Sequence, residues 1–317
     1  MPDYSKTDPG MLEFLNQFYG AETVGFEAIG LDNARAMLEA LPDMVDLPAV
    51  EVGEVRDLEV AGADGPLKAR LYTPENAKPN SPGLIFYHGG GWIMGGLDSH
   101  DRPCRRICAE GNIPVLAVDY RLAPEHPFPA AVDDAQAAFH WACEHADELG
   151  MDKTRLIVGG DSAGGNIAAS ISLSLRGDVR GEPAFQFLIY PGLQAFGLAP
   201  SHEKFGEGYA LDKADMEFFL TSYAGKDVST SNDPRLWPLL AESFENAPPA
   251  YIITAGQDPI QDDGIQYAQA LEKAGVLATH KHYPGMTHGF CSMTALSPDA
   301  LCALEDAARF IGAALRG

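Results

Sequence analysis

The sequence predicts an α/β protein built on a mostly parallel sheet that helices cover on both faces. Two observations lead to this prediction. Short apolar runs of strand length alternate with helix-compatible segments along most of the 317 residues, and such alternation is typical of a parallel sheet with crossover helices. Two of the apolar runs also end directly in glycine-rich turns, at the strand ends where such sheets form their sites.

The expected elements follow in order along the chain. Strand patterns span residues 50–58, 67–72, 82–87, 113–118, 156–158, 185–190, 250–256 and 280–283. Helix patterns span residues 11–19, 33–41, 130–149, 166–176, 209–223 and 298–315. The final helix has Ser297 as its expected N-cap and Pro298 at its first position, a combination that favours a helix start.

The alternation lapses in two parts of the chain, which we interpret as a helical cap. The first 45 residues hold two helix-like stretches and no strand pattern, and the segment from Gln194 to about Pro238 also has none. We therefore expect residues 1–45 and 194–240 to form the cap. Residues 46–193 and 241–317 are expected to form the α/β core.

The segment from Gly160 to Gly164 lies between an apolar run and a helix-compatible run. Strand, sharp turn and helix are the context of a nucleophile elbow, in which a strained turn lifts the hydroxyl of a serine clear of the sheet. The chain passes close to itself there, so residues without a β-carbon fit best two positions before and after the serine. We interpret Ser162 as the nucleophile; the alternative is a plain glycine-rich turn.

A second glycine-rich turn, His88–Trp92, follows the strand pattern of residues 82–87. Three consecutive glycines are costly in backbone entropy, which indicates that the backbone itself has a role. We expect the amides of Gly89 and Gly90, together with that of Ala163, to form an oxyanion hole. A flexible loop is the alternative. A phosphate cradle is disfavoured, because the turn lacks the lysine and Ser/Thr of a P-loop and the spacing of a dinucleotide motif.

An acid and a histidine follow later in the chain. Asp258 comes directly after the apolar run of residues 250–256, and His288 lies in a loop beside glycines. In this order they fit the orienting acid and the general base that activate a serine. Asp262 and Asp263 are rival acids, but we expect them a turn into the following helix.

Five segments occur in an order that is typical of one enzyme family: His88–Trp92, Asp119–Ala131, Gly160–Gly165, Asp258-Pro259 and His288–Phe290. Together they resemble the hormone-sensitive-lipase-like family of α/β-hydrolases, the bacterial GDSAGG-type esterases. The resemblance covers about residues 83 to 290. It implies an α/β-hydrolase fold with eight strands, a helical cap over the active site, and no cofactor. It also implies Ser162, Asp258 and His288 as the catalytic triad.

Aromatic residues near these motifs are candidates for a substrate pocket. We expect Trp92, Tyr209, Trp237 and Phe290 to line it, although a single aromatic residue is more often part of a core. Similar proteins usually carry a small residue where Trp237 stands, so this position leaves the shape of the pocket open. The charged loop at 119–125 is interpreted as a brace for the active site.

The formal net charge of −23 and the pI near 4.6 are the unusual bulk properties. Such a field repels nucleic acid and anionic membrane surfaces, so neither is expected as a partner. It also disfavours anionic substrates. Solubility is a sufficient reason for the charge, and a salt-adapted host is the alternative.

Cysteine usage and hydropathy bear on location. The five cysteines are an odd number without metal-ligand spacing, which indicates free thiols in a reducing compartment and predicts no metal site. No apolar run approaches the length of a membrane span, and the chain opens without a leader pattern. A cytoplasmic protein is therefore expected, as a monomer or a homodimer.

The function predicted from these motifs is that of a serine carboxylesterase, which hydrolyses short-chain, fairly apolar esters through an acyl-enzyme on Ser162. Short acyl chains are implied by the resemblance alone. An amidase or a lactone hydrolase would use the same residues. A non-catalytic small-molecule receptor is disfavoured because all three triad residues are present, and a lipase would need a larger apolar lid than residues 194–238 offer.

Overall fold

The structure is a computed structural model, and it describes residues 2–20, 25–226 and 228–315. Eight strands form one sheet in the order β1-β2-β4-β3-β5-β6-β7-β8. Their bounds are β1 Glu54–Gly62, β2 Gly65–Thr73, β3 Ser81–Tyr87, β4 Val115–Val118, β5 Met151–Asp161, β6 Phe185–Ile189, β7 Ala250–Gln257 and β8 Ala278–Thr287. Pairing is antiparallel for β1 with β2 and for β2 with β4, and parallel for all later pairs. The sequence prediction of a mostly parallel sheet is confirmed.

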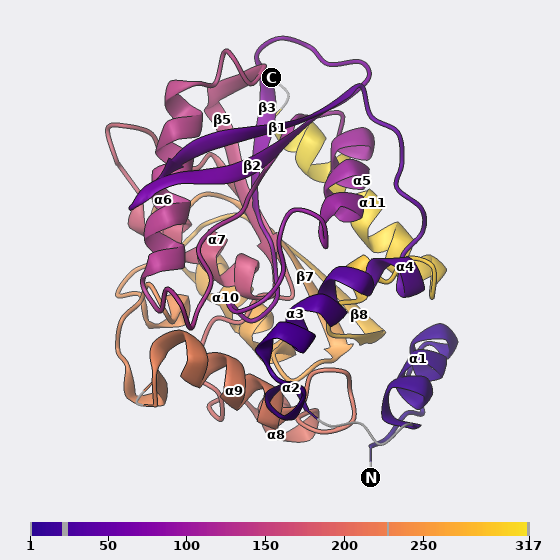
Figure 1. The fold of residues 1–317 in the computed structure, drawn as a ribbon. Coiled ribbons are helices and arrows are strands. Elements are labelled where there is room, and N and C mark those ends of the chain that lie inside the picture. Colours follow the sequence, from indigo (N-terminus) through magenta and orange to yellow (C-terminus); the bar gives the residue numbers. More distant parts are fainter. Residues whose placement is uncertain (1, 21–24, 227, 316–317) are drawn as a thin grey trace.

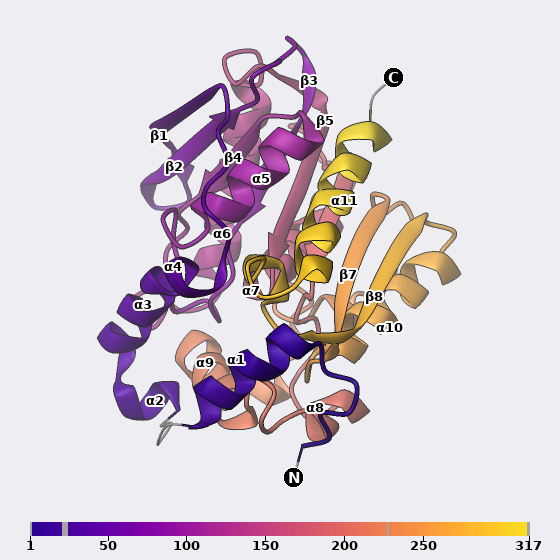
Figure 2. The same ribbon diagram turned by 90° about the vertical axis from the view of Figure 1, so that its right-hand side faces the viewer.

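Helices cover both faces of this sheet (Figures 1 and 2). One face carries α5 (Asp101–Gly111) and α11 (Pro298–Ala314), and the other carries α6 (Ala130–Glu144), α7 (Ala163–Ser174) and α10 (Gln261–Lys273). The strand β3 shows why two layers are needed. All of its residues are buried, and alternate side chains enter different hydrophobic clusters, Leu84 and Phe86 on the α5–α11 side and Ile85 and Tyr87 on the other. This is the two-residue period of a strand that is buried on both faces.

Several predicted bounds were wrong, and tertiary pairing explains the differences. The first strand runs from Glu54 to Gly62 and not from Val50 to Leu58, because it pairs with β2 from Thr73, where β2 ends, back to the tight turn where Gly62 pairs with Gly65. The strand expected at 280–283 extends over 278–287, since it pairs with β7 along most of that length. The helix expected at 130–149 ends at Glu144.

Short helices gather at the end of the sheet where the parallel strands finish (Figures 1 and 2). From the N-terminal part come α1 (Pro9–Gly20), α2 (Phe26–Ile29), α3 (Leu31–Ala40) and α4 (Pro42–Val45), and from the middle of the chain come α8 (Pro200–Lys204) and α9 (Lys213–Ala224). The two groups touch. The rings of Phe26 and Phe219 lie 5.4 Å apart, and the Phe26 amide donates to Asp215 Oδ1 at 3.0 Å.

Within the described residues, no helix combines the length and the apolar character that a membrane span needs.

Candidate active site

Ser162 lies in the sharp turn between β5 and α7. Its backbone has φ 53° and ψ −116°, a combination that a residue with a side chain rarely adopts. The flanking glycines allow this turn, because an added β-carbon would lie 2.2 Å from the Tyr87 carbonyl oxygen at Gly160 and 1.9 Å from it at Gly164. This crowding is the steric reason for a glycine two positions before the serine and another two positions after it.

The structure brings Ser162, His288 and Asp258 together. His288 Nε2 lies 2.9 Å from Ser162 Oγ, and His288 Nδ1 lies 2.8 Å from Asp258 Oδ2. Asp258 is completely buried, and its other oxygen accepts the amide of Ile260 at 2.9 Å. Because a carboxylate only accepts hydrogen bonds, Nδ1 carries the imidazole proton and Nε2 is left to accept the proton of the serine hydroxyl.

The rival acids are used elsewhere. Asp263 lies 2.9 Å from His202 Nε2 and accepts the amide of Leu193 at 2.8 Å. Asp262 accepts the amide of Ser201 at 3.0 Å. Both aspartates therefore hold α8 and the adjacent chain to α10, and Asp258 is the carboxylate that faces His288.

The structure corrects the prediction for the oxyanion hole. The amide of Gly89 donates to Asp161 Oδ1 at 2.9 Å, so it is not available to a substrate. Gly90 and Gly91 follow with φ +114° and +61°, and both line the cavity above Ser162, as does Ala163. Among the described residues, the amides of Gly90 and Gly91 have no hydrogen-bond acceptor. The three free amides at this point are therefore those of Gly90, Gly91 and Ala163.

A cavity of about 660 Å³ opens over the serine. Its apolar wall comes largely from α1, α3, α4 and α9, with Phe14, Met37, Leu38, Leu41, Phe219 and Leu220 among the lining residues. None of these lining residues was predicted from the sequence. The only signal was the amphipathic character of the terminal helices, which does not tell a pocket wall from a core.

The predicted aromatic residues divide into two pairs. Trp92 and Trp237 line the cavity. Phe290 does not, because it is fully buried between the rings of Tyr190 and Tyr283, at 5.7 and 5.4 Å. Tyr209 points away as well, and its hydroxyl accepts the amide of Asp3 at 2.8 Å.

The charged loop after β4 braces the site, as predicted. The Tyr120 hydroxyl donates to the carbonyl of His88 at 2.6 Å, and Glu125 forms a two-pronged ion pair with Arg35 of α3, with both contacts at 2.8 Å. One partner lies in the glycine turn and the other in the N-terminal helices. The loop therefore ties both parts to the core.

The chemistry of the site is that of acyl transfer. A serine lies within hydrogen-bonding distance of a histidine, and the histidine lies within hydrogen-bonding distance of a buried carboxylate. Free backbone amides lie beside the serine. Among the described residues, no group of three or more His, Cys, Asp or Glu side chains could hold a metal ion. All five cysteines are free, and four of them are buried.

A family model described as the alpha/beta hydrolase fold matches residues 84–292. The chain belongs to the α/β-hydrolase family. Carboxylic ester hydrolase LipN of Mycobacterium tuberculosis is 43% identical over 278 residues, which cover 85% of this chain and 73% of LipN. Ethyl acetate hydrolase of Pseudomonas putida is 36% identical, with 92% of this chain and 94% of the relative covered.

Solved structures agree with these relatives. The ester-hydrolase EH1AB1 from the metagenome of Lake Arreo superposes with a TM-score of 0.92 at 38% identity, over 97% of this chain and 99% of that chain. An esterase from Pyrobaculum calidifontis gives a TM-score of 0.88 at 33% identity, over 97% and 99% of the two chains. This α/β-hydrolase is a serine carboxylesterase of the hormone-sensitive-lipase-like group, as the motifs predicted.

Proposed function

We propose that the enzyme hydrolyses apolar carboxylic esters through an acyl-enzyme on Ser162. The observation that carries the proposal is the hydrogen-bonded series Ser162–His288–Asp258, with contacts of 2.9 and 2.8 Å, at the base of an apolar cavity. In this proposal His288 Nε2 takes the hydroxyl proton as Oγ attacks the ester carbonyl carbon. Asp258 holds the imidazole in the required tautomer and stabilises the imidazolium.

The amides of Gly90, Gly91 and Ala163 receive the negative charge that develops on the carbonyl oxygen. His288 then transfers its proton to the leaving alcohol, and the acyl group remains on Ser162. A water molecule then attacks the acyl carbonyl carbon while His288 removes its proton. The second tetrahedral intermediate collapses as His288 returns that proton to Ser162 Oγ, which releases the acid and restores the free serine. Free amides in residues that line the cavity support this role, because no existing hydrogen bond has to break when the charge appears.

The substrate group we propose is wider than the resemblance implies. A cavity of about 660 Å³ lies within the roughly 300–1,000 Å³ that holds drug-sized ligands. Ethyl or acetyl groups would leave most of it unfilled. We therefore propose apolar esters with short to medium-length acyl chains, with the cap formed by residues 1–45 and 194–240 as the wall that limits chain length. The net charge of −23 disfavours anionic esters.

The test is hydrolysis of p-nitrophenyl esters from acetyl to palmitoyl by wild type, Ser162→Ala and Ser170→Ala. Ser170 is a matched control, because it is buried in the next helix and its hydroxyl has no partner among the described residues. We expect turnover that Ser162→Ala abolishes and Ser170→Ala retains. Turnover of anilides or lactones in preference to every ester would favour the amidase or lactone-hydrolase alternative.

Two further points stay predictions. Cell fractionation would test the cytoplasmic location, and sedimentation at the working concentration would show whether the protein is a monomer or a homodimer.

A further inference from the structure

Asp161 is a buried acid in the wall of the active site. It ends β5 directly before Ser162, is 8% exposed, and lines the cavity. No hydrogen bond links it to His288 among the contacts of the described residues. Instead, its Oδ1 accepts the amide of Gly89 at 2.9 Å and lies 3.3 Å from His100 Nε2. Burying a carboxylate is costly unless it is paired, so these two partners indicate what the residue does.

The contact between Asp161 and Gly89 restricts the orientation of the two backbone amides that follow Gly89. A β-carbon at Gly89 would lie 2.3 Å from Asp161 Oδ2, so the turn lies directly against the carboxylate. Gly90 and Gly91 come next, both with positive φ. Because Asp161 fixes the peptide plane immediately before them, it restricts the directions in which their amides can point.

The contacts of His100 fit a doubly protonated ring. The Ser99 Oγ lies 3.2 Å from the Gly96 carbonyl oxygen and 3.0 Å from His100 Nδ1, so when the hydroxyl donates to the carbonyl its oxygen is left to accept a proton from Nδ1. On the other side, Nε2 faces the Asp161 carboxylate, which only accepts. With both ring nitrogens protonated, the pair is an imidazolium beside a carboxylate.

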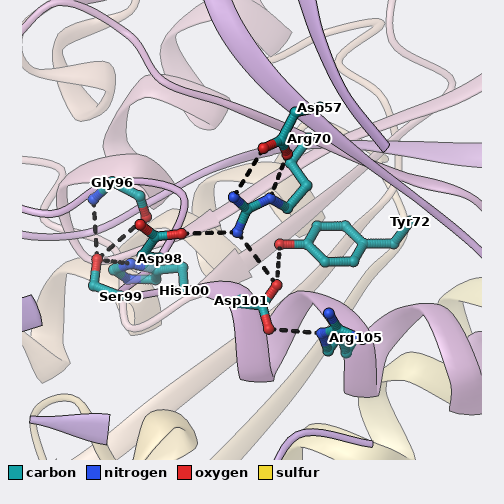
Figure 3. A network of polar contacts seen from close by, with 9 residues as sticks. All are labelled: Asp57, Arg70, Tyr72, Gly96, Asp98, Ser99, His100, Asp101 and Arg105. Carbon is teal, nitrogen blue, oxygen red and sulfur yellow. Dashed lines mark hydrogen bonds and ion pairs between the residues drawn. The ribbon is translucent and has the colours of Figure 1, made fainter. Parts of the chain in front are cut away.

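The loop that carries His100 is itself firmly held, as Figure 3 shows. Arg70 of β2 contacts Asp98 at 2.9 Å and Asp57 at 2.6 Å. Asp101, at the start of α5, accepts the Tyr72 hydroxyl at 3.0 Å and pairs with Arg105 at 2.6 Å. These contacts attach the residues on both sides of His100 to β2 and α5.

We propose that Asp161 and His100 are positioning residues that form a neutral charge pair and aim the amides of Gly90 and Gly91 at the oxyanion. Asp161 holds the Gly89 amide, and His100 holds Asp161 and cancels its charge. Without that cancellation, a carboxylate in the cavity wall would oppose the negative charge that develops beside Ser162. The inference rests on the oxyanion hole of the proposed function.

The surrounding groups leave the charge of the pair undisturbed. Burial lowers the pKa of His88 to about 3, so this ring stays neutral. Burial also raises the pKa of the other close groups well above their ordinary values, which keeps them uncharged: Cys104, Tyr120, Tyr190 and Cys291. Glu39 of α3 also faces His100, and its charge favours the imidazolium.

Within the pair, each charge opposes the effect of burial on the other. Burial would lower the pKa of His100, but the charge of Asp161 raises it above the ordinary value. Burial would likewise raise the pKa of Asp161, but His100 and the Gly89 amide lower it. Both shifts therefore favour the charged form of the pair. As the pH rises through the elevated pKa of His100, the carboxylate loses its counter-charge, and turnover should fall.

The test uses His100→Gln, Asp161→Asn and the double variant, with His140→Gln as control. His140 is also a buried histidine near an aspartate, 3.4 Å from Asp178, but it does not line the cavity. We expect each single variant to lose at least about 10-fold in kcat, with KM changed by less than about 3-fold. Affinity for a trifluoromethyl ketone, which forms a tetrahedral adduct on serine, should fall in parallel. The control should keep both values.

Two further readouts separate positioning from a purely structural role. In the Asp161→Asn background, His100→Gln should cost less than about 3-fold, because no carboxylate charge is left to cancel. The alkaline decline of kcat in wild type should be absent from the double variant. The inference is overturned if both folded single variants keep wild-type kcat and inhibitor affinity, or if the two losses multiply independently. This outcome can be told apart from failure of the proposed function. If the proposed function failed, wild-type turnover would not depend on Ser162.

Discussion

His288 Nδ1 lies 2.8 Å from Asp258 Oδ2, although the two residues belong to loops after different strands, β7 and β8. The parallel pairing of these strands brings their carboxyl ends side by side. The aspartate is completely buried and the histidine reaches the cavity. One end of the imidazole is therefore held by the core, while the other faces the serine.

Asp258→Asn should lower kcat strongly with little effect on KM. An amide cannot hold the imidazole in the tautomer that accepts the serine proton, and in a well-studied serine protease the equivalent change costs about 10⁴-fold. We expect a loss of about 10³- to 10⁴-fold here. Steady-state kinetics on a p-nitrophenyl ester checks this. Asp262→Asn is the control and should stay within about 3-fold of wild type; a large loss there would return Asp262 as a candidate acid.

Gly164→Ala should prevent the elbow from folding. The added β-carbon would lie 1.9 Å from the Tyr87 carbonyl oxygen, so backbone has to move, and we expect at least about 3 kcal/mol of lost stability. Gly177→Ala is the matched control. It has φ +72° but no atom within 4 Å, so its cost should be about 1 kcal/mol. Urea denaturation of both variants measures the difference, and equal losses would contradict the steric explanation.

Arg35→Ala should loosen the N-terminal helices without unfolding the core. Its guanidinium pairs with Glu125 and also donates to the carbonyls of Ile93 and Ala123, at 2.8 and 3.1 Å. The pair is partly exposed, so we expect about 1–2 kcal/mol in local stability. Limited proteolysis should cut within residues 2–45 faster than in wild type. Arg180→Ala, which removes a more exposed arginine from its ion pair with Asp178, should leave the digestion rate unchanged.

Asp215→Asn should gain stability relative to wild type as the pH rises. Burial raises the pKa of Asp215 above its ordinary value, so the folded protein holds this proton more tightly than the unfolded chain. Its contribution is therefore present at acid pH and is lost as the pH rises through the elevated pKa. Asparagine has no charge to bury and can still accept the Phe26 amide. The difference in Tm between variant and wild type should grow from about pH 4 to pH 7, and a constant difference would contradict the assignment.

Much of the site follows from local sequence patterns. A β-carbon has no room two positions before Ser162 or two positions after it, so the glycines at 160 and 164 mark the turn wherever it occurs. Asp258 and His288 each come at the end of a strand pattern, and a parallel sheet gathers such ends at one edge. The fold class, the enzyme family and the three residues Ser162, His288 and Asp258 could for this reason be predicted from the sequence.

The cavity wall could not be predicted in the same way. Phe290 and Tyr209 were expected to line the pocket together with Trp92, but one is buried among other rings and the other turns toward Asp3. The apolar lining comes instead from short helices of the first 45 residues and from α9. Their hydrophobic spacing is the same whether they cover a core or a substrate, because the pattern records burial and not the partner.

By itself, the sequence determined the sheet, the elbow and the order of nucleophile, acid and base, because backbone geometry and burial leave local signatures. The tertiary structure decided which amides are free to bind an oxyanion. The amide of Gly89 is taken by Asp161, 72 residues further along the chain, while those of Gly90 and Gly91 remain open. Three adjacent glycines look alike in sequence, and whether a donor is satisfied depends on partners that only folding brings to it.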